Sequence, residues 1–309
     1  MKFIYSIQSE WLKRKRSSVS WLVLVGGFFI PLIIIIARLV YRSETVMNNS
    51  TDGIWLKLYN QCWQYMAVFL LPMGITLAAS LITQIEYRNN AWKQVYTSPQ
   101  AVSTIFWAKY VVVLIILVQF FMLFNIGIYS TGLIPAIIYA DVPYPKEPFP
   151  FWRFVIGNYK FFIDCLPILA LQYLLSLHIK NFIVPIGVGF ALLIASIIGM
   201  SWHYGYLLPY TYIARPFIAA DKKIDAGINT ERWACAYFVF FTLLNYVLFV
   251  LKSQTKLSGL LRKKRIKHIA MLSLCALLFF IAAELLGLFG NKQTSKVKAN
   301  SVVEIDARI

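Results

Sequence analysis

Long apolar runs alternate with short polar segments along almost the whole chain. A helix that crosses the roughly 30 Å hydrocarbon core of a bilayer needs about 20 mainly apolar residues. Because lipid offers no partner to an unpaired backbone amide, such runs must be helical. The pattern therefore predicts an all-α integral membrane protein, a bundle of six to seven transmembrane helices. The predicted spans cover residues 20–40, 62–83, 106–130, 160–178, 182–202, 233–251 and 269–289.

Two acidic residues, Asp164 and Glu284, fall inside predicted spans. A central Asp costs about 3 kcal/mol on insertion, whereas each Leu, Ile or Phe contributes about −0.3 to −0.6 kcal/mol. Asp164 lies near the start of a run rich in these apolar residues, so we expect the run to insert. Either acid can lie at headgroup depth or face the bundle interior. Both are therefore candidate pathway or bundle-interior residues.

Composition supports the membrane assignment. The 309 residues are 59% hydrophobic and 14% charged, against roughly 45–50% and about 25% in soluble domains. These values exclude a soluble enzyme, a disordered chain, a coiled coil and a collagen-like fibre. The net charge of +17 comes from basic residues at the ends of apolar runs, which indicates membrane orientation rather than nucleic-acid binding. Dense basic runs at 13–16 and 262–267 predict a multi-pass protein of the cell (inner) membrane with a cytoplasmic N-terminus.

Motifs for chemistry are absent from the sequence. It contains no GxxxxGK[ST] loop for nucleotide phosphates, no HExxH and no GxSxG. The four cysteines form no CxxC pair, and the three histidines lie far apart. We therefore expect no cofactor, no metal site and no catalytic residue in this chain.

Two segments on the predicted inner side have apolar residues at helical spacing but are too short to cross the membrane. Residues 1–16 fit a short amphipathic helix along the membrane surface, the alternative being an unstructured basic tail. Residues 84–99 fit a short exposed amphipathic helix that Pro99 ends, the alternative being an ordinary polar connector. A rigid helix held between two spans has the shape needed to dock a partner.

On the predicted outer side, residues 203–230 are apolar and aromatic but are interrupted by Pro209 and Pro216. A segment this short and interrupted fits a re-entrant or interfacial hairpin. The chain shows no internal repeat and no inverted repeat between its halves, which weakens a repeat-built secondary transporter.

The stretch that begins at Glu86 resembles a known family. Glu-Tyr-Arg-Asn-Asn-Ala-Trp-Lys-Gln-Val at 86–95, then Ser-Pro at 98–99 and Lys109 before a long apolar run, is similar to permeases of ATP-binding-cassette transporters. The type-2 exporter class, which includes lantibiotic-immunity permeases, is the most similar. The layout match covers residues 1–251. The remaining 252–309, a basic loop with an extra span at 269–289 and an outer tail, exceed the usual six-span plan.

The resemblance implies that a separate ATPase subunit hydrolyses ATP and that two permeases, as a homo- or heterodimer in membrane lipid, form the pathway. The chain itself would then be no enzyme and would bind no nucleic acid. It also implies an interface helix at 1–16, a coupling helix at 84–99 and a re-entrant segment at 203–230. The ATPase-docking residues would be Glu86, Asn90, Trp92, Lys93 and Tyr96, and the interface-helix residues would be Glu10, Trp11, Lys13 and Arg14.

Three other classes stay open on the residues alone. A self-contained secondary transporter would need polar, broken helices near the midplane. A membrane-embedded enzyme would need Asp164, Glu284 and a histidine to converge. An assembly or sensing subunit could keep the docking helix and have lost the pathway.

Overall fold

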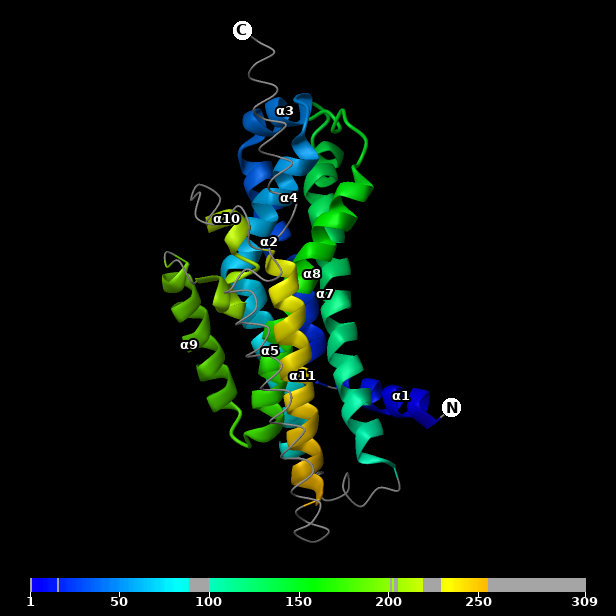
Figure 1. The fold of residues 1–309 in the computed structure, drawn as a ribbon. Helices are drawn as coiled ribbons and strands as arrows, with labels where there is room; N and C mark the ends of the chain where they lie inside the picture. The colour runs from blue at the N-terminus through cyan, green and yellow to red at the C-terminus, as the bar shows by residue number, and fades with distance from the viewer. Residues whose placement is uncertain are drawn as a thin grey trace.

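The computed structural model describes residues 2–15, 17–88, 100–200, 202, 205–218 and 229–254, and all regular structure within these ranges is helical. The helices form an elongated bundle (Figure 1). The longer helices are α1 (Lys2–Lys15), α2 (Val19–Val40), α3 (Arg42–Ser50), α4 (Ile54–Tyr65), α5 (Leu71–Arg88), α7 (Val102–Ile138), α8 (Phe151–His178), α9 (Ile183–Gly199) and α11 (Thr230–Gln254). The short ones are η1 (Met66–Leu70), η2 (Gly205–Leu207), η3 (Pro209–Thr211) and α10 (Arg215–Ile218).

The all-helical, multi-span membrane fold is confirmed. Five described helices are long and apolar enough to cross a membrane, and α9 is a shorter apolar helix. The five are Val19–Val40, Ile54–Tyr87, Val102–Ile138, Phe151–His178 and Thr230–Lys252. The predicted span at 269–289, with Glu284, lies outside the described residues.

The second span begins earlier than its hydropathy predicts, at Ile54 rather than at 62, because α4, η1 and α5 run on as one rod. Four buried residues of its first turns lie on one helical face: Ile54, Trp55, Leu58 and Tyr59. Lys57 between them, and Asn60 and Gln61 after them, lower the mean hydropathy and hide this face from a window average. The π-turn η1 precedes Pro72, where a proline ring would clash with the carbonyl one turn earlier.

The fifth predicted span, 182–202, is shorter in the structure because α9 ends at Gly199. The chain turns back there: the amide of Trp202 donates to the carbonyl of Gly199, and the amide of Gly205 donates to the carbonyl of Trp202. A Cβ at Gly205 would collide with the Gly199 carbonyl, so only glycine fits this approach. The segment 205–218 then packs its buried side chains against the bundle; whether it re-enters the membrane stays a prediction.

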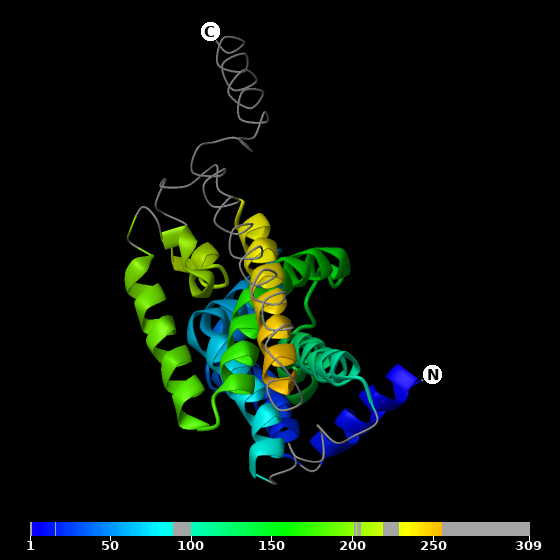
Figure 2. The same ribbon diagram turned by 60° about the horizontal axis from the view of Figure 1, so that its bottom comes forward.

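The core lies around α7, which packs against α2, α1, α4 and α11. The largest fully buried side chains include Trp63, which stacks on Phe161 with ring centroids 4.1 Å apart. α2 and α7 come close where a Cβ on Gly127 would lie 2.6 Å from Pro31 Cγ. α1 lies across one end of the bundle and α3 lies at the opposite end (Figure 1). Figure 2 shows α1 and α9 on opposite sides of the bundle.

Candidate functional site

α1 is fixed to α7 and to Gln100, which shortly precedes α7, by two of its side chains. Ser6 Oγ donates a hydrogen bond to Gln100 Oε1 at 3.0 Å. Arg14 Nη1 donates to Gln119 Oε1 at 2.7 Å, and its guanidinium lies 4.0 Å from the centre of the Trp11 ring. Ser6 and Arg14 are both buried, so this helix is a packed part of the bundle rather than an unstructured tail.

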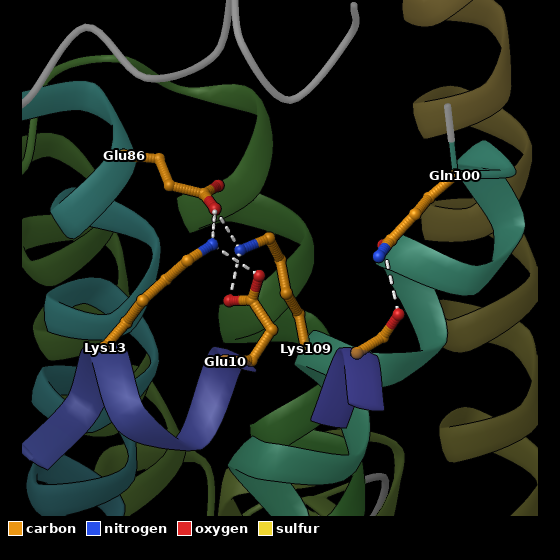
Figure 3. Close-up of polar contacts among 6 residues, drawn as sticks. Glu10, Lys13, Glu86, Gln100 and Lys109 are labelled. Atoms are coloured by element: carbon orange, nitrogen blue, oxygen red, sulfur yellow. Dashed lines mark hydrogen bonds and ion pairs between the residues drawn. The ribbon is translucent and has the colours of Figure 1, made fainter. Parts of the chain in front are cut away.

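Four charged side chains meet where α1 crosses α5 and α7, as Figure 3 shows. Lys109 Nζ pairs with Glu10 Oε2 at 2.7 Å and also with Glu86 Oε1. Lys13 Nζ pairs with Glu10 Oε1 at 2.6 Å and with Glu86 Oε1 at 3.4 Å. Each ammonium group therefore contacts both carboxylates. We call Glu10, Lys13, Glu86 and Lys109 the charged cluster.

The four side chains of the charged cluster range from partly exposed to buried. The side chain of Lys13 is 39% exposed and that of Glu10 is 13% exposed, whereas Lys109 is 3% and Glu86 is 2% exposed. A charge this deeply buried needs a close partner, because desolvation is otherwise uncompensated. Within the part of the chain that the structure describes, Oε2 of Glu86 is buried and accepts no hydrogen bond. The buried carboxylate of Glu86 thus depends on Lys109 and Lys13 to compensate its charge.

The two α1 members of the cluster have shifted pKa values in opposite directions. Burial alone would raise the pKa of the Glu10 carboxyl, but Lys109 and Lys13 outweigh it and hold that pKa below its ordinary value. Burial alone would lower the pKa of the Lys13 ammonium, but Glu10 and Glu86 hold it above its ordinary value. Both groups are therefore charged at neutral pH.

The helical membrane fold agrees with what sequence comparison finds. The sequence model of a family described as ABC-2 family transporter protein matches residues 6–196. This stretch is more than half of the chain. The chain belongs to the ABC-2 transporter family. No curated protein and no solved structure matches it. Family membership makes it a membrane component of a transporter rather than an enzyme.

The match places the whole charged cluster inside the ABC-2 region of the chain. From the sequence, Glu10 and Lys13 were assigned to an interface helix and Glu86 to docking, and the structure brings all three together. The sequence reasoning left Lys109 out of the site. The resemblance included this lysine at the start of a long apolar run but gave it no role in the site, although a cation in that position favours a carboxylate near it.

The remaining predicted docking residues, Asn90, Trp92, Lys93 and Tyr96, lie outside the described residues. Their role in this ABC-2 protein stays a prediction. The Glu86 carboxylate points into the charged cluster (Figure 3) and is buried, so its contacts in the structure are within the chain. Direct docking by Glu86 likewise stays a prediction.

Asp164 lies apart from the cluster, on α8. Its side chain is 5% exposed and Oδ1 has no hydrogen-bond partner among the described residues. Asp164 is thus buried within the bundle, as a role in its interior requires. Within the described ranges no group of three His, Cys, Asp or Glu side chains is placed to hold a metal.

Proposed function

We propose that this ABC-2 protein is the permease subunit of an ATP-driven exporter of the type-2 class. In this proposal it pairs with a second permease, like or unlike itself, and docks a separate ATPase subunit on the side of α1, which faces the cytoplasm. The family match supports a transport role. The absence of a phosphate-binding GxxxxGK[ST] loop from the sequence supports a separate ATPase.

The charged cluster is the observation that carries the proposal. The segment assigned to docking, 84–99, begins at the end of α5, and α7 follows it. Glu86 on α5 and Lys109 on α7 thus flank its central part on both sides and pair with each other. Glu10 on α1 pairs with the same Lys109. A displacement of the docking segment would therefore act on three helices together.

This arrangement suits a rigid-body mechanism. Alternating conformations of a transporter require that a push at one end move whole helices rather than bend a loop. Buried ion pairs are short and directional, so they transmit displacement between elements that they join. In this account Glu86 and Lys109 are positioning residues: they join α5, which leads into the docking segment, to α1 and α7, and they do no covalent chemistry.

The substitution Glu86→Arg tests the proposal. It replaces the shared anion with a third cation beside Lys13 and Lys109, so we expect co-purification of the ATPase to fall while the chain still inserts in the membrane. Glu86→Gln removes the charge without adding repulsion and should show a smaller loss. Glu44→Arg is the matched control, because Glu44 is exposed on α3 at the opposite end of the bundle.

Undiminished co-purification of the ATPase with Glu86→Arg would overturn the role of the cluster. Membrane abundance and thermal midpoint of each variant, measured on the same preparations, separate lost docking from lost folding. The expected result is a Glu86→Arg variant that is inserted and still folded at the temperature of purification, although with a lowered thermal midpoint, and that has lost the ATPase.

A second candidate function, a self-contained transporter coupled to protons, rests on the buried Asp164 and its unpartnered Oδ1. The two functions differ in what Asp164→Asn does. Proton coupling through Asp164 requires a titratable carboxyl, so transport would stop. An ATP-driven permease keeps ATP-dependent transport after this nearly isosteric change.

A further inference from the structure

An apolar groove of about 600 Å³ runs between α2 and α5, with α7 beneath it. Its rim carries exposed apolar side chains: Trp21 is 71% exposed and Phe69 is 45% exposed. Its floor is built of buried ones, such as Leu71 and Ile116. None of the described side chains that line the groove is charged. The groove therefore offers an open, apolar surface at the side of the bundle.

The walls of the groove carry small residues. On α5, Gly74 and Ala78 both line it, one helical turn apart, and a Cβ placed on Gly74 would meet nothing within 4 Å. On α2, Gly26 lines the opposite wall, and a Cβ there would meet only the Phe120 ring, at 3.6 Å. Helices associate in membranes where small residues let their backbones approach closely. The two walls are therefore suited to a packed helix.

The groove starts at the end of the bundle at which α11 ends. Ser18, which lines the groove, immediately precedes α2 on the side of α1. Near the end of α11, Lys252 Nζ donates to Tyr87 Oη at 3.2 Å. Tyr87 is adjacent in the sequence to Glu86 of the charged cluster, which α1 contacts. The chain after Gln254 therefore leaves the bundle at the end where the groove starts.

The sequence continues beyond α11 with residues 255–309, which lie outside the described residues. Within them, 269–289 is the one apolar run long enough to cross a membrane. An extended chain advances about 3.3 Å per residue, so the connection 255–268 can reach about 45 Å. Packed helices lie only roughly 8–10 Å apart, so this connection is long enough to bring the run to the groove.

We propose that the apolar run 269–289 packs as a helix into the groove between α2 and α5 of the same chain. Residues 269–283 carry no charge, which matches the uncharged walls. If the helix starts at the Ser18 end, Glu284 lies about 22 Å along it, beyond the roughly 16 Å that residues 18–29 of α2 cover. The charge of Glu284 is thus kept out of the groove.

The run also supplies small residues for a close approach. In a helix, Ser273, Ala276 and Ala283 share one face, which would contact Gly74 and Ala78 of α5. The covalent connection raises the local concentration of this run at the groove above that of a helix from a second chain. This proposal does not depend on ATP-driven transport.

Disulfide cross-linking in the membrane tests the proposal, because Cys275 lies in the run. Cys275 is about 9 Å into the run and Gly26 is about 10 Å into α2, so the two should lie at similar depth. The test chain carries Gly74→Cys or Gly26→Cys, Cys235→Ser and a specific protease site in the connection 255–268. The cysteines at 62 and 165 are 0% exposed and stay in place.

After oxidation and proteolysis, only a disulfide keeps the C-terminal fragment attached to the rest of the chain on a non-reducing gel. We expect the attached product from Gly74→Cys or Gly26→Cys to exceed that of the control at least about tenfold, because tethering sets the effective concentration. Cys275→Ser should abolish it. Cysteines at 276, 277 and 278, each combined with Cys275→Ser, cover the other faces of the same helical turn.

Gly187→Cys is the matched control, because a Cβ on Gly187 of α9 also meets nothing within 4 Å and lies outside the groove. It should give only background attachment to Cys275.

Two results would overturn the proposal. The first is attachment no greater than that of Gly187→Cys from all four cysteine positions of the run, with Gly74→Cys and with Gly26→Cys, which would leave the groove to lipid. The second is a disulfide that joins two chains rather than two fragments of one chain, which would assign the groove to a second copy.

Discussion

The two ends of the bundle carry the same kind of interaction in opposite settings. At the α1 end, Glu86 and Lys109 pair while almost fully buried. At the α3 end, Arg42 pairs with Asp141 in the connection after α7, and each side chain is 50% exposed. Arg42 Nε donates to Asp141 Oδ2 at 2.8 Å, so the geometry of this pair is good. The ends differ in burial rather than in chemistry.

The difference in burial decides what each pair can do. An exposed pair is screened by water and salt, and its formation contributes little to stability. A buried pair must be kept, because loss of one partner leaves an uncompensated charge in the core. We infer that the exposed pair can open and close freely at the α3 end, whereas the charged cluster constrains α1, α5 and α7 to move together.

The largest effect is expected from Lys109→Met, which keeps an unbranched side chain and removes the charge. Glu86 and Glu10 would then share only Lys13, and we expect a destabilisation of about 3–5 kcal/mol. Unfolding in detergent or lipid, monitored by temperature or denaturant, measures it. The double variant Lys109→Met with Glu86→Leu removes both buried charges and should recover much of the loss. A neutral effect of Lys109→Met alone would mean that the buried pair is not needed.

A smaller effect is expected from pH. The pKa of Glu10 is lowered in the folded chain, so its stabilisation is present above the unfolded pKa of about 4.3 and is lost as pH falls through the folded value. The pKa of Lys13 is raised, so its stabilisation is present below the unfolded pKa of about 10.4 and is lost as pH rises through the folded value. These two groups should therefore leave the thermal midpoint unchanged between these limits and lower it outside them.

Glu10→Gln isolates the acid limb of this profile. Without the titrating carboxyl, the fall of the thermal midpoint between about pH 5 and pH 3 should become shallower. An acid limb identical to that of the native chain would show that Glu10 does not contribute to it.

The smallest effect is expected at the exposed pair. Asp141→Asn keeps the shape of the side chain and removes its charge, and we expect no measurable change in the thermal midpoint or in its salt dependence. A clear loss of stability from Asp141→Asn would contradict the contrast between the two ends, since the exposed pair would then contribute as much to stability as a buried one.

Hydropathy predicted the bundle because lipid solvation acts on each run separately. It placed the spans at 20–40 and 160–178 inside the observed α2 and α8. It misplaced the start of the second span, because Lys57, Asn60 and Gln61 lower the hydropathy of a segment whose apolar face only packing reveals. It also placed the end of α9 too late, because the turn at Gly199 depends on the later Gly205.

The charged cluster could be predicted only in part. The helical spacing of residues 1–16 indicated a helix, and the resemblance drew attention to Glu86 and Lys109. That Glu10 and Lys109 meet depends on where α1 crosses α7, a contact between residues 99 positions apart. No local pattern encodes such a contact, since it depends on how α1 packs on the bundle through Trp11 and through the hydrogen bond from Arg14 to Gln119.

The measurement that tests the central claim most directly is affinity purification of the chain from its native membrane in mild detergent, with mass spectrometry of every protein that accompanies it. The account predicts a stoichiometric partner with a GxxxxGK[ST] nucleotide-binding loop, reduced in the Glu86→Arg variant and retained in Glu44→Arg. A chain that transports its cargo and is recovered without any such ATPase, in detergent and again in lipid discs, would contradict the account.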